Sequence, residues 1–317
     1  CRRICMSQHE NSTRTATDPA PSSPELPATL RLGAVHLTVS NLDSSVAFYR
    51  DAIGLRLHRR KKSVAAMGTT GGEDLVVLYE EPGVRRAGRH AGLYHYALLY
   101  PSRVELARAA LRLAATRTPI QGASDHGTHE AIYLPDPDGN GIELAADRPR
   151  EAWPDLANPG WDGGPKPLDL DGLLALVAGE EPRREAGTGL VVGHVHLHVG
   201  DIERGLSFYR GVLGFERMFS MPTAAFVAAG GYHHHLGFNV WRGEGVGPAP
   251  AGRVGLRHWT IVLDDPADLD AVRRRVLAAG IEVEEHEGGG FVVRDPWEIA
   301  VLFTVAPSSP SASKVGS

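Results

Sequence analysis

An internal repeat is the feature that most constrains the fold of this chain. Residues 39–50 (VSNLDSSVAFYR) match residues 199–210 (VGDIERGLSFYR), 160 positions further on. In each copy an alternating apolar run reaches Asn41 or Asp201, which are typical helix N-caps, and apolar residues at helical spacing follow. Gly54 and Gly214 then end the helix before a new strand. The order strand, helix, strand therefore occurs twice.

A weaker repeat follows each of these copies. Here a strand leads into a helix, predicted at 104–116 and 269–279, and then into two strands joined by a turn. Both turns contain Asp-Pro, at 136–137 and 295–296, which aligns the two copies. The chain therefore consists of four units, named A, B, C and D, which span residues 31–90, 93–147, 190–243 and 255–306.

The segments outside the units have compositions of their own. Residues 148–189 are rich in Pro, Gly, Trp and acidic residues and predict a linker with one short helix at 168–178. Two tandem domains, 31–147 and 190–306, are expected on either side of it, in keeping with a length of 317 residues. Residues 1–30 and 307–317 are rich in Ser, Thr and Pro and are expected to be disordered tails.

Composition excludes several classes of partner. The net charge of −5 comes from mixed acidic and basic residues, without a basic patch for nucleic acid or an anionic membrane. The only cysteines, Cys1 and Cys5, cannot supply a disulfide framework or a thiolate metal site, and a reducing cytoplasm is expected. No apolar run approaches the roughly 18 residues that a membrane span needs. A small molecule is the expected partner.

Histidine is the unusual residue. Ten of the 15 histidines fall in two windows, His90 to His129 and His194 to His235. A random surface distribution does not explain this clustering, and imidazole is both the commonest metal ligand and the commonest acid–base group near neutral pH. The two windows are therefore the candidate functional segments.

The Phe-Tyr-Arg helices (48–50 and 208–210) and the segment DPDGNGIE (136–143) resemble the vicinal-oxygen-chelate superfamily of glyoxalases, bleomycin-resistance proteins and extradiol dioxygenases. Four further segments resemble its bacterial catechol 2,3-dioxygenase branch: residues 92–97, 122–126, 145–149 and 230–241. The resemblance covers nearly all of 31–306. It implies an α+β fold of four βαβββ modules in two tandem vicinal-oxygen-chelate (glyoxalase-like) domains.

The resemblance also implies an activity. Extradiol dioxygenases of this kind cleave a catechol-type aromatic diol with O2, using Fe(II) or, as an alternative, Mn(II), and they commonly form homo-oligomers. The metal binds two His and one carboxylate on one face, which leaves positions for the diol and O2. A further His and a Tyr act as catalytic groups. In this superfamily two units form a cup, and the ligands come from the first and last strands of the paired units.

The ligand positions can be matched unit by unit. Unit C has His194 on its first strand, whereas unit A has Ala34 there. Unit B has His95 on its first strand and Glu143 on its last, with Tyr133 ten residues before Glu143, the separation typical of the catalytic Tyr and the ligand Glu.

Unit D does not complete a site. His258 lies on its first strand, but Leu302 and Val292 stand in place of the Glu and the Tyr. Pairing C with D would therefore need Glu298 or water as the third ligand, and pairing A with B would provide only one His and one Glu.

Pairing B with C fills every position. The predicted metal ligands are His95, Glu143 and His194, and the predicted catalytic residues are His234 and Tyr133. We therefore expect B and C to share the working cup, within one chain or between two chains of a dimer, and A and D to form a degenerate cup.

Further residues are expected around these ligands. His194, His196 and His198 alternate along one strand face, so His196 and His198 should line the cup beside the ligand. Among residues 233–235, alternation selects the middle residue, His234, while a one-residue slip would select His233 or His235.

A loop before Tyr133 offers other candidates. Asp125, His126 and His129 would orient the substrate hydroxyls, or Asp125 would simply cap an Asx-turn. Asn239, in the 230–241 segment, is also expected near the substrate.

Ordinary structural roles compete with these interpretations. Most strand histidines are satisfied polar residues, which is the expectation for the set His36, His58, His90, His258 and His286. Glu143 could be a solvated strand-end carboxylate.

Two rival functions remain open on the sequence. A glyoxalase-like isomerase or transferase would normally use two carboxylates among four ligands, and only Glu143 is found here. A metal-free protein that binds an aromatic antibiotic would not need the triad. Metal analysis and a test for the yellow ring-cleavage product separate these cases.

Overall fold

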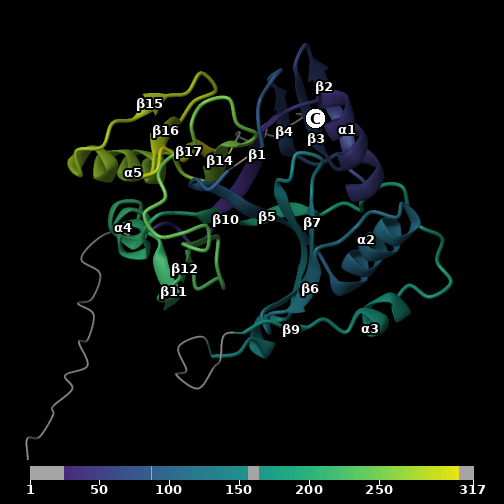
Figure 1. Ribbon diagram of the computed structural model, residues 1–317. Helices are drawn as coiled ribbons and strands as arrows, with labels where there is room; N and C mark the ends of the chain where they lie inside the picture. Colours follow the sequence, from purple (N-terminus) through teal and green to yellow (C-terminus); the bar gives the residue numbers. More distant parts are fainter. Residues whose placement is uncertain (1–24, 87, 156–163, 307–317) are drawn as a thin grey trace, which may run out of the picture.

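The computed structural model describes residues 25–86, 88–155 and 164–306. The tails predicted to be disordered lie outside the described residues, except for 25–30. Each of the four predicted units has the order strand, helix, three strands. The α+β fold of tandem βαβββ modules is therefore confirmed (Figure 1).

The elements of the first half match the predicted order. Unit A consists of β1 (Arg31–Val39), α1 (Leu42–Phe48), the π-helical turn η1 (Tyr49–Ile53), β2 (Arg56–Lys61), β3 (Val64–Gly68) and β4 (Asp74–Glu80). Unit B consists of β5 (Gly92–Tyr100), α2 (Arg103–Ala115), β6 (Gly122–Asp125), β7 (His129–Pro135) and β8 (Gly141–Asp147). The connection to unit C contains η2 (Arg150–Ala152), β9 (Lys166–Pro167) and the short helix α3 (Leu170–Ala175).

The second half repeats this order. Unit C consists of β10 (Val191–His198), α4 (Ile202–Leu206), η3 (Ser207–Val212), β11 (Glu216–Met221), β12 (Ala224–Ala228) and β13 (Leu236–Asn239). Unit D consists of β14 (Gly255–Leu263), α5 (Pro266–Ala278), β15 (Glu284–Glu285), β16 (Phe291–Arg294) and β17 (Ala300–Val305). Within the described ranges, no helix is both long and apolar enough to span a bilayer.

The repeated helices begin and end where the sequence indicates. The Asn41 side chain accepts a hydrogen bond from the Ser44 amide at 2.8 Å, and Asp201 accepts one from the Arg204 amide at 2.7 Å. These contacts satisfy amide donors that the first turn of a helix leaves free. Gly54 follows the first helix with a φ of 84°, a conformation that favours glycine.

Strand pairing joins units from opposite halves of the chain. Within each unit the first strand runs parallel to the last, as in β5–β8 and β10–β13. The first strands then pair antiparallel, β1 with β14 and β5 with β10. Units A and D therefore share one set of strands, and B and C share another (Figure 1). The B–C pairing forms within a single chain.

The alternative C–D site does not form. His258 on β14 lies opposite His36 on β1, with the ring centroids 3.9 Å apart. Its partner strand therefore comes from unit A, and His194 lies on β10, which pairs with β5 of unit B. Glu298 is exposed in the turn before β17.

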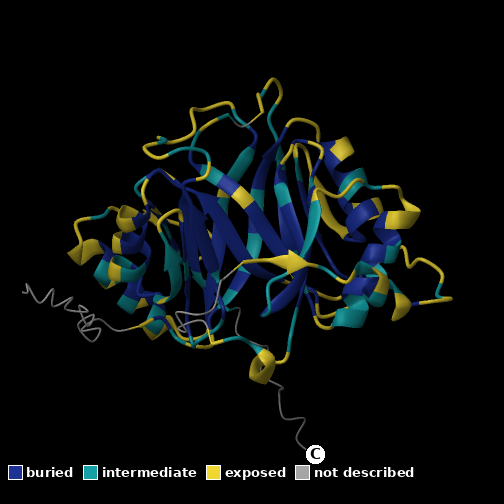
Figure 2. Cartoon of the chain, turned by 60° about the horizontal axis from the view of Figure 1, so that its bottom comes forward, coloured by how far each residue is buried: buried dark blue, intermediate teal, exposed yellow. Residues whose placement is uncertain are grey.

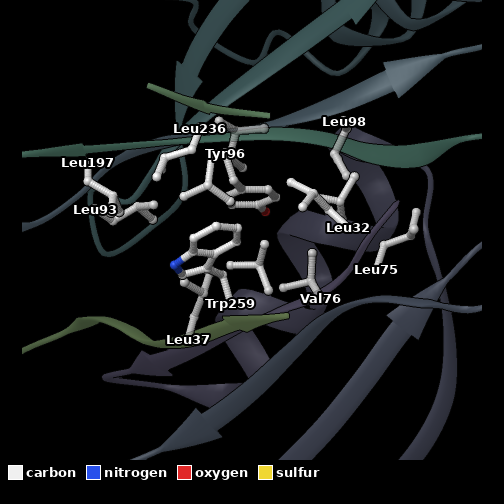
Figure 3. Close-up of a cluster of buried hydrophobic side chains, with 14 of the residues drawn as sticks. Leu32, Leu37, Leu75, Val76, Leu93, Tyr96, Leu98, Leu197, Leu236 and Trp259 are labelled. Carbon is white, nitrogen blue, oxygen red and sulfur yellow. The ribbon is translucent and has the colours of Figure 1, made fainter. Parts of the chain in front are cut away.

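The hydrophobic core lies between the two sets of strands. Tyr96 on β5 and Trp259 on β14 are fully buried and face one another among aliphatic side chains such as Leu37 (Figure 3). Most strands at the centre of the molecule are buried, whereas exposed residues lie on loops, on the outer faces of helices and on the strands β2 and β9 (Figure 2). Burying large aromatic and aliphatic side chains is the main source of folding free energy.

Two buried tyrosine–aspartate contacts tie units of the same half together. Tyr49 of unit A donates to Asp136 of unit B at 3.3 Å, and Tyr209 of unit C donates to Asp295 of unit D at 2.7 Å. Each aspartate is the Asp of an Asp-Pro turn and also accepts from backbone amides of that turn. Burial raises the pKa of Asp295 to about 6, although these hydrogen bonds favour its ionised form.

Replacing Tyr209 by Phe should lower the free energy of unfolding by about 1–3 kcal/mol, because a buried carboxyl group loses a donor. Urea unfolding followed by circular dichroism measures the change. Tyr79→Phe is the control, since this partly exposed hydroxyl pairs with His36 and water can replace it. Equal losses in the two variants would contradict a special role for the buried contact.

Candidate active site

The pairing of β5 with β10 sets the positions of the candidate ligands. His95 lies opposite His196, and Ala97 lies opposite His194. Between His95 and Leu93 the register shifts, so β5 has one extra residue, Tyr94. Such a bulge changes the direction of side chains. As a result Tyr94 and His95 both line a cavity, while their neighbours pack in the core.

The neighbouring strands of unit B bring the carboxylate and the tyrosine to the same face. Glu143 on β8 lies beside Ala97 on β5, and Tyr133 on β7 lies directly opposite Glu143. Gly141 starts β8, and a Cβ atom there would overlap the Tyr94 carbonyl oxygen. The Asp-Gly-Asn-Gly turn therefore lets the strand carrying Glu143 approach the strand carrying His95.

His95, Glu143 and His194 converge on one point. The Nε2 atoms of both histidines lie 3.1 Å from Glu143 Oε2. One potential ligand atom from each residue lies within 4.8 Å of the other two. The side chains are 8%, 1% and 2% exposed for His95, Glu143 and His194. An exposed, solvated Glu143 is therefore excluded.

The protonation states suit a cation. Burial alone would raise the pKa of Glu143, but the charge of His194 and hydrogen bonds from the surrounding histidines hold it well below its ordinary value. Burial lowers the pKa of His194. An ionised carboxylate is the form of Glu143 that a divalent metal binds.

The second carboxylate oxygen of Glu143 also indicates a cation site. Glu143 Oε1 is buried and makes no hydrogen bond of good geometry, although His129 Nε2 lies 3.0 Å away. A buried carboxylate oxygen without a well-aligned hydrogen bond is costly unless a cation satisfies it. The donor set of two imidazoles and one carboxylate is that of a facial triad for Fe(II). The residues present therefore fit such a metal.

His95 and Glu143 of the triad line a cavity of about 640 Å³, and His194 lies directly behind them. Polar groups from unit B line one part of it, and apolar side chains from unit C line another. The apolar part consists of Phe219, Met221, Phe226 and Trp241. The polar part includes Tyr94, His95, Gln121, Ser124, His126, Thr128, His129, Tyr133 and Glu143. A cavity of this kind suits an aromatic ligand with a polar end.

Tyr133 keeps its proton in this setting. Burial, followed by the charge of Glu143, raises its pKa well above the ordinary value. Its hydroxyl oxygen lies 2.7 Å from His126 Nε2. Tyr133 can therefore donate or accept a hydrogen bond at the cavity surface without ionising.

Residues 233–235 differ from the alternating pattern expected of them, because they precede β13, which starts at Leu236. Both His233 and His234 line the cavity, and the His234 ring lies 4.1 Å from that of His194. His235 is absent from the described cavity lining, and its Nδ1 accepts from the Ala229 amide.

Asn239 connects the histidines of β10. Its side-chain nitrogen lies 2.9 Å from His196 Nε2, and its oxygen lies 2.8 Å from His198 Nδ1. His196 lines the cavity as expected. His198 is buried against Tyr94 and is not among the described lining residues. Asn239 therefore fixes ring orientation rather than facing a ligand.

Asp125 caps an Asx-turn, the second of the two roles expected for it. It accepts from the Gly127 amide at 2.8 Å, as in an Asx-turn, and pairs with Arg148 at 2.8 Å. The described cavity lining does not include it. Its neighbour His126 does line the cavity.

Two further residues belong to this network. His129 touches Glu143, and Asp147 lies 3.0 Å from His233 Nε2. Neither is among the predicted ligands or catalytic groups. Strand alternation could have indicated Asp147, because residues 143, 145 and 147 share one face of β8. The partner of Asp147 is His233 of unit C, and no sequence pattern indicates that these two residues meet.

Comparison with known proteins identifies the family. Residues 31–144 and 191–303 match the Glyoxalase/Bleomycin resistance protein/Dioxygenase superfamily. The chain belongs to this superfamily. It is 39% identical over 269 residues to the Catechol-2,3-dioxygenase of Bacillus subtilis, which covers 84% of this chain and 93% of that protein. A Biphenyl-2,3-diol 1,2-dioxygenase of Rhodococcus globerulus is 29% identical over 38% of this chain and 64% of its own length.

Solved structures of other proteins share the fold. A Bacillus subtilis protein aligns with a TM-score of 0.60 at 16% identity, over 90% of this chain and 87% of that one. Glyoxalase I from Zea mays aligns with a TM-score of 0.55 at 18% identity, over 87% of this chain and 92% of that one. At these identities the likeness shows the tandem fold only.

Replacing Glu143 by Gln should lower the metal content of anaerobically purified protein by more than about tenfold, because the charged donor is lost. Elemental analysis measures metal per chain. His258→Ala is the matched control, since His258 has on β14 the position that His95 has on β5. Metal loss in the control, or full retention in Glu143→Gln, would contradict the assignment.

Proposed function

We propose that the chain is an extradiol ring-cleavage dioxygenase that acts on a catechol-type aromatic diol with O2. Fe(II) is the proposed metal, with Mn(II) as the alternative. The observation that carries the proposal is the convergence of His95, Glu143 and His194 beside a cavity that also holds Tyr133 and His234. The similarity to the Bacillus catechol dioxygenase over most of both chains supports it.

When bound by this triad, the metal supplies the Lewis acidity that lowers the hydroxyl pKa of the diol and the redox chemistry that activates O2. The chain itself holds the reactants and moves protons. His234 is buried at the cavity surface and faces His194. As a neutral imidazole it accepts a proton from a diol hydroxyl and returns it later in the reaction.

Tyr133 has a different role, as a hydrogen-bond donor. Because it stays protonated, it donates a hydrogen bond to a substrate oxygen and stabilises negative charge that develops there. His126 fixes the direction of that hydroxyl through the 2.7 Å contact. Burial lowers the pKa of His126 to about 4, so this partner is neutral.

His234→Ala should leave the metal bound and slow turnover by about 10²–10⁴-fold, the usual contribution of a general acid–base group. The test combines elemental analysis with the rate of formation of the yellow semialdehyde from catechol. Turnover close to that of the native chain would refute the role of His234. If the native chain binds metal but does not cleave catechol, the metal site stands and the proposed reaction is rejected. If it binds no metal, a metal-free binding protein is favoured.

The cavity also indicates the size of the diol. A volume of about 640 Å³ falls in the range of pockets that hold drug-sized molecules, larger than one aromatic ring needs. The wall formed by Phe219, Phe226 and Trp241 would cover an apolar substituent on the ring. We therefore propose a substituted diol as the preferred substrate.

Trp241→Ala should raise KM for an aryl-substituted diol by about tenfold and change KM for unsubstituted catechol much less, because only the larger substrate reaches this side chain. Steady-state kinetics with both diols measure the difference. An equal effect on both substrates would contradict the placement of the substituent.

A further inference from the structure

Three side chains form a hydrogen-bonded series that ends at the cavity. Asp147 Oδ1 lies 3.0 Å from His233 Nε2, and His233 Nδ1 lies 2.9 Å from His234 Nδ1. The other Asp147 oxygen accepts from the Tyr232 hydroxyl at 2.9 Å. His233 and His234 are buried, and the Asp147 side chain is 26% exposed. The series therefore connects the cavity to a carboxylate near the surface.

The chemistry of each group fixes where the protons are. A carboxylate only accepts hydrogen bonds, so His233 must carry its proton on Nε2. A neutral imidazole has one N–H, and His233 Nδ1 is therefore an acceptor. The Nδ1 atom of His234 must then be the donor. This leaves Nε2 as the unprotonated nitrogen of His234, a residue that lines the cavity.

Packing holds the middle ring in place. The His129 ring stacks on His233 with centroids 4.7 Å apart and planes 15° from parallel. Trp153 contacts the His233 ring edge-on, with a centroid separation of 5.1 Å. The His233 ring cannot turn to exchange its two nitrogens without displacing these neighbours. The direction of the hydrogen bonds is thus determined by structure as well as by charge.

We propose that Asp147 and His233 are positioning residues that fix the tautomer of His234, so that His234 Nε2 receives the proton of the diol. This inference rests on the proposed function. In the proton transfer, the O–H bond of the diol breaks and an N–H bond forms at His234 Nε2. The His234 imidazolium keeps its Nδ1–H hydrogen bond to His233. The negative charge of Asp147 offsets the positive charge of the imidazolium. The same Nε2 proton later returns to the product.

The same region allows a competing explanation. Potential ligand atoms of His129, Asp147 and His233 lie within 4.8 Å of one another, a spacing that could hold a cation. However, both ring nitrogens of His233 already make hydrogen bonds. A cation would have to displace the contact with Asp147. A second metal ion per chain, lost in His233→Gln, would therefore overturn the hydrogen-bonded series.

Kinetic variants test the role of the carboxylate. In Asp147→Asn the Tyr232 hydroxyl keeps the amide oxygen, so the amide nitrogen faces His233 and reverses both hydrogen bonds. We expect kcat to fall by about 10²-fold or more, with KM and metal content changed less than about threefold. A change in KM alone, or loss of metal, would contradict a positioning role.

The middle residue allows a matched pair of variants. His233→Gln can still accept from His234 through its oxygen and donate to Asp147 through its nitrogen, whereas His233→Leu has similar bulk and does neither. We expect the Gln variant to retain at least about tenfold more kcat than the Leu variant. Equal losses would indicate that His233 only fills space.

The tautomer can be observed without relying on turnover. Long-range ¹H–¹⁵N NMR of the full chain, labelled in histidine and loaded with diamagnetic Zn(II), should show His234 protonated on Nδ1. The same result is expected for Tyr232→Phe, which leaves the series intact, and the Nε2 tautomer is expected for Asp147→Asn. An Nε2 tautomer in the native chain would overturn the inference even if diols are cleaved. An Nδ1 tautomer without diol cleavage would instead reject the proposed function alone.

Discussion

The antiparallel pairing of β5 with β10 is the contact on which the site depends. It places His95 and His194, which are 99 positions apart in the sequence, on adjacent strands. It also joins the polar residues of unit B to the apolar wall of unit C. The bulge at Tyr94 lets two consecutive residues face the cavity. Without this pairing, Glu143 would be a buried carboxylate with fewer partners, which is costly.

The four units form a closed ring of contacts. Strand pairing joins A to D and B to C, while the Tyr49–Asp136 and Tyr209–Asp295 contacts join A to B and C to D. Strand pairing thus connects the two halves of the chain, and the tyrosine–aspartate contacts connect the two units within each half. The core around Tyr96 and Trp259 fills the space between the two sets of strands (Figure 3). The A–D pair packs against the B–C pair through this core.

Much of the fold could be predicted from the sequence because the repeat is local. Caps, glycines and apolar periodicity identify each helix and strand without reference to distant residues, and the predicted helix at 104–116 is observed at Arg103–Ala115. The choice of B with C followed from counting which units hold His and carboxylate. The structure brings these residues together, and their role as ligands stays a prediction.

The parts that could not be predicted depend on contacts between units. Alternation fails at residues 233–235 because they are an irregular segment before β13, so two histidines reach the cavity instead of one. The contact of His129 with Glu143 and that of Asp147 with His233 have no counterpart in local spacing. Asp125 was expected near the substrate because it belongs to the family-like segment 122–126. It caps a turn instead, whereas its neighbour His126 lines the cavity.

A crystal structure of the anaerobically prepared protein, with anomalous data collected at the iron absorption edge, tests the central claim most directly. We predict one anomalous peak per chain, from an iron ion coordinated by His95, Glu143 and His194. A peak between His36 and His258, or an iron-loaded crystal with no peak at the triad, would contradict it.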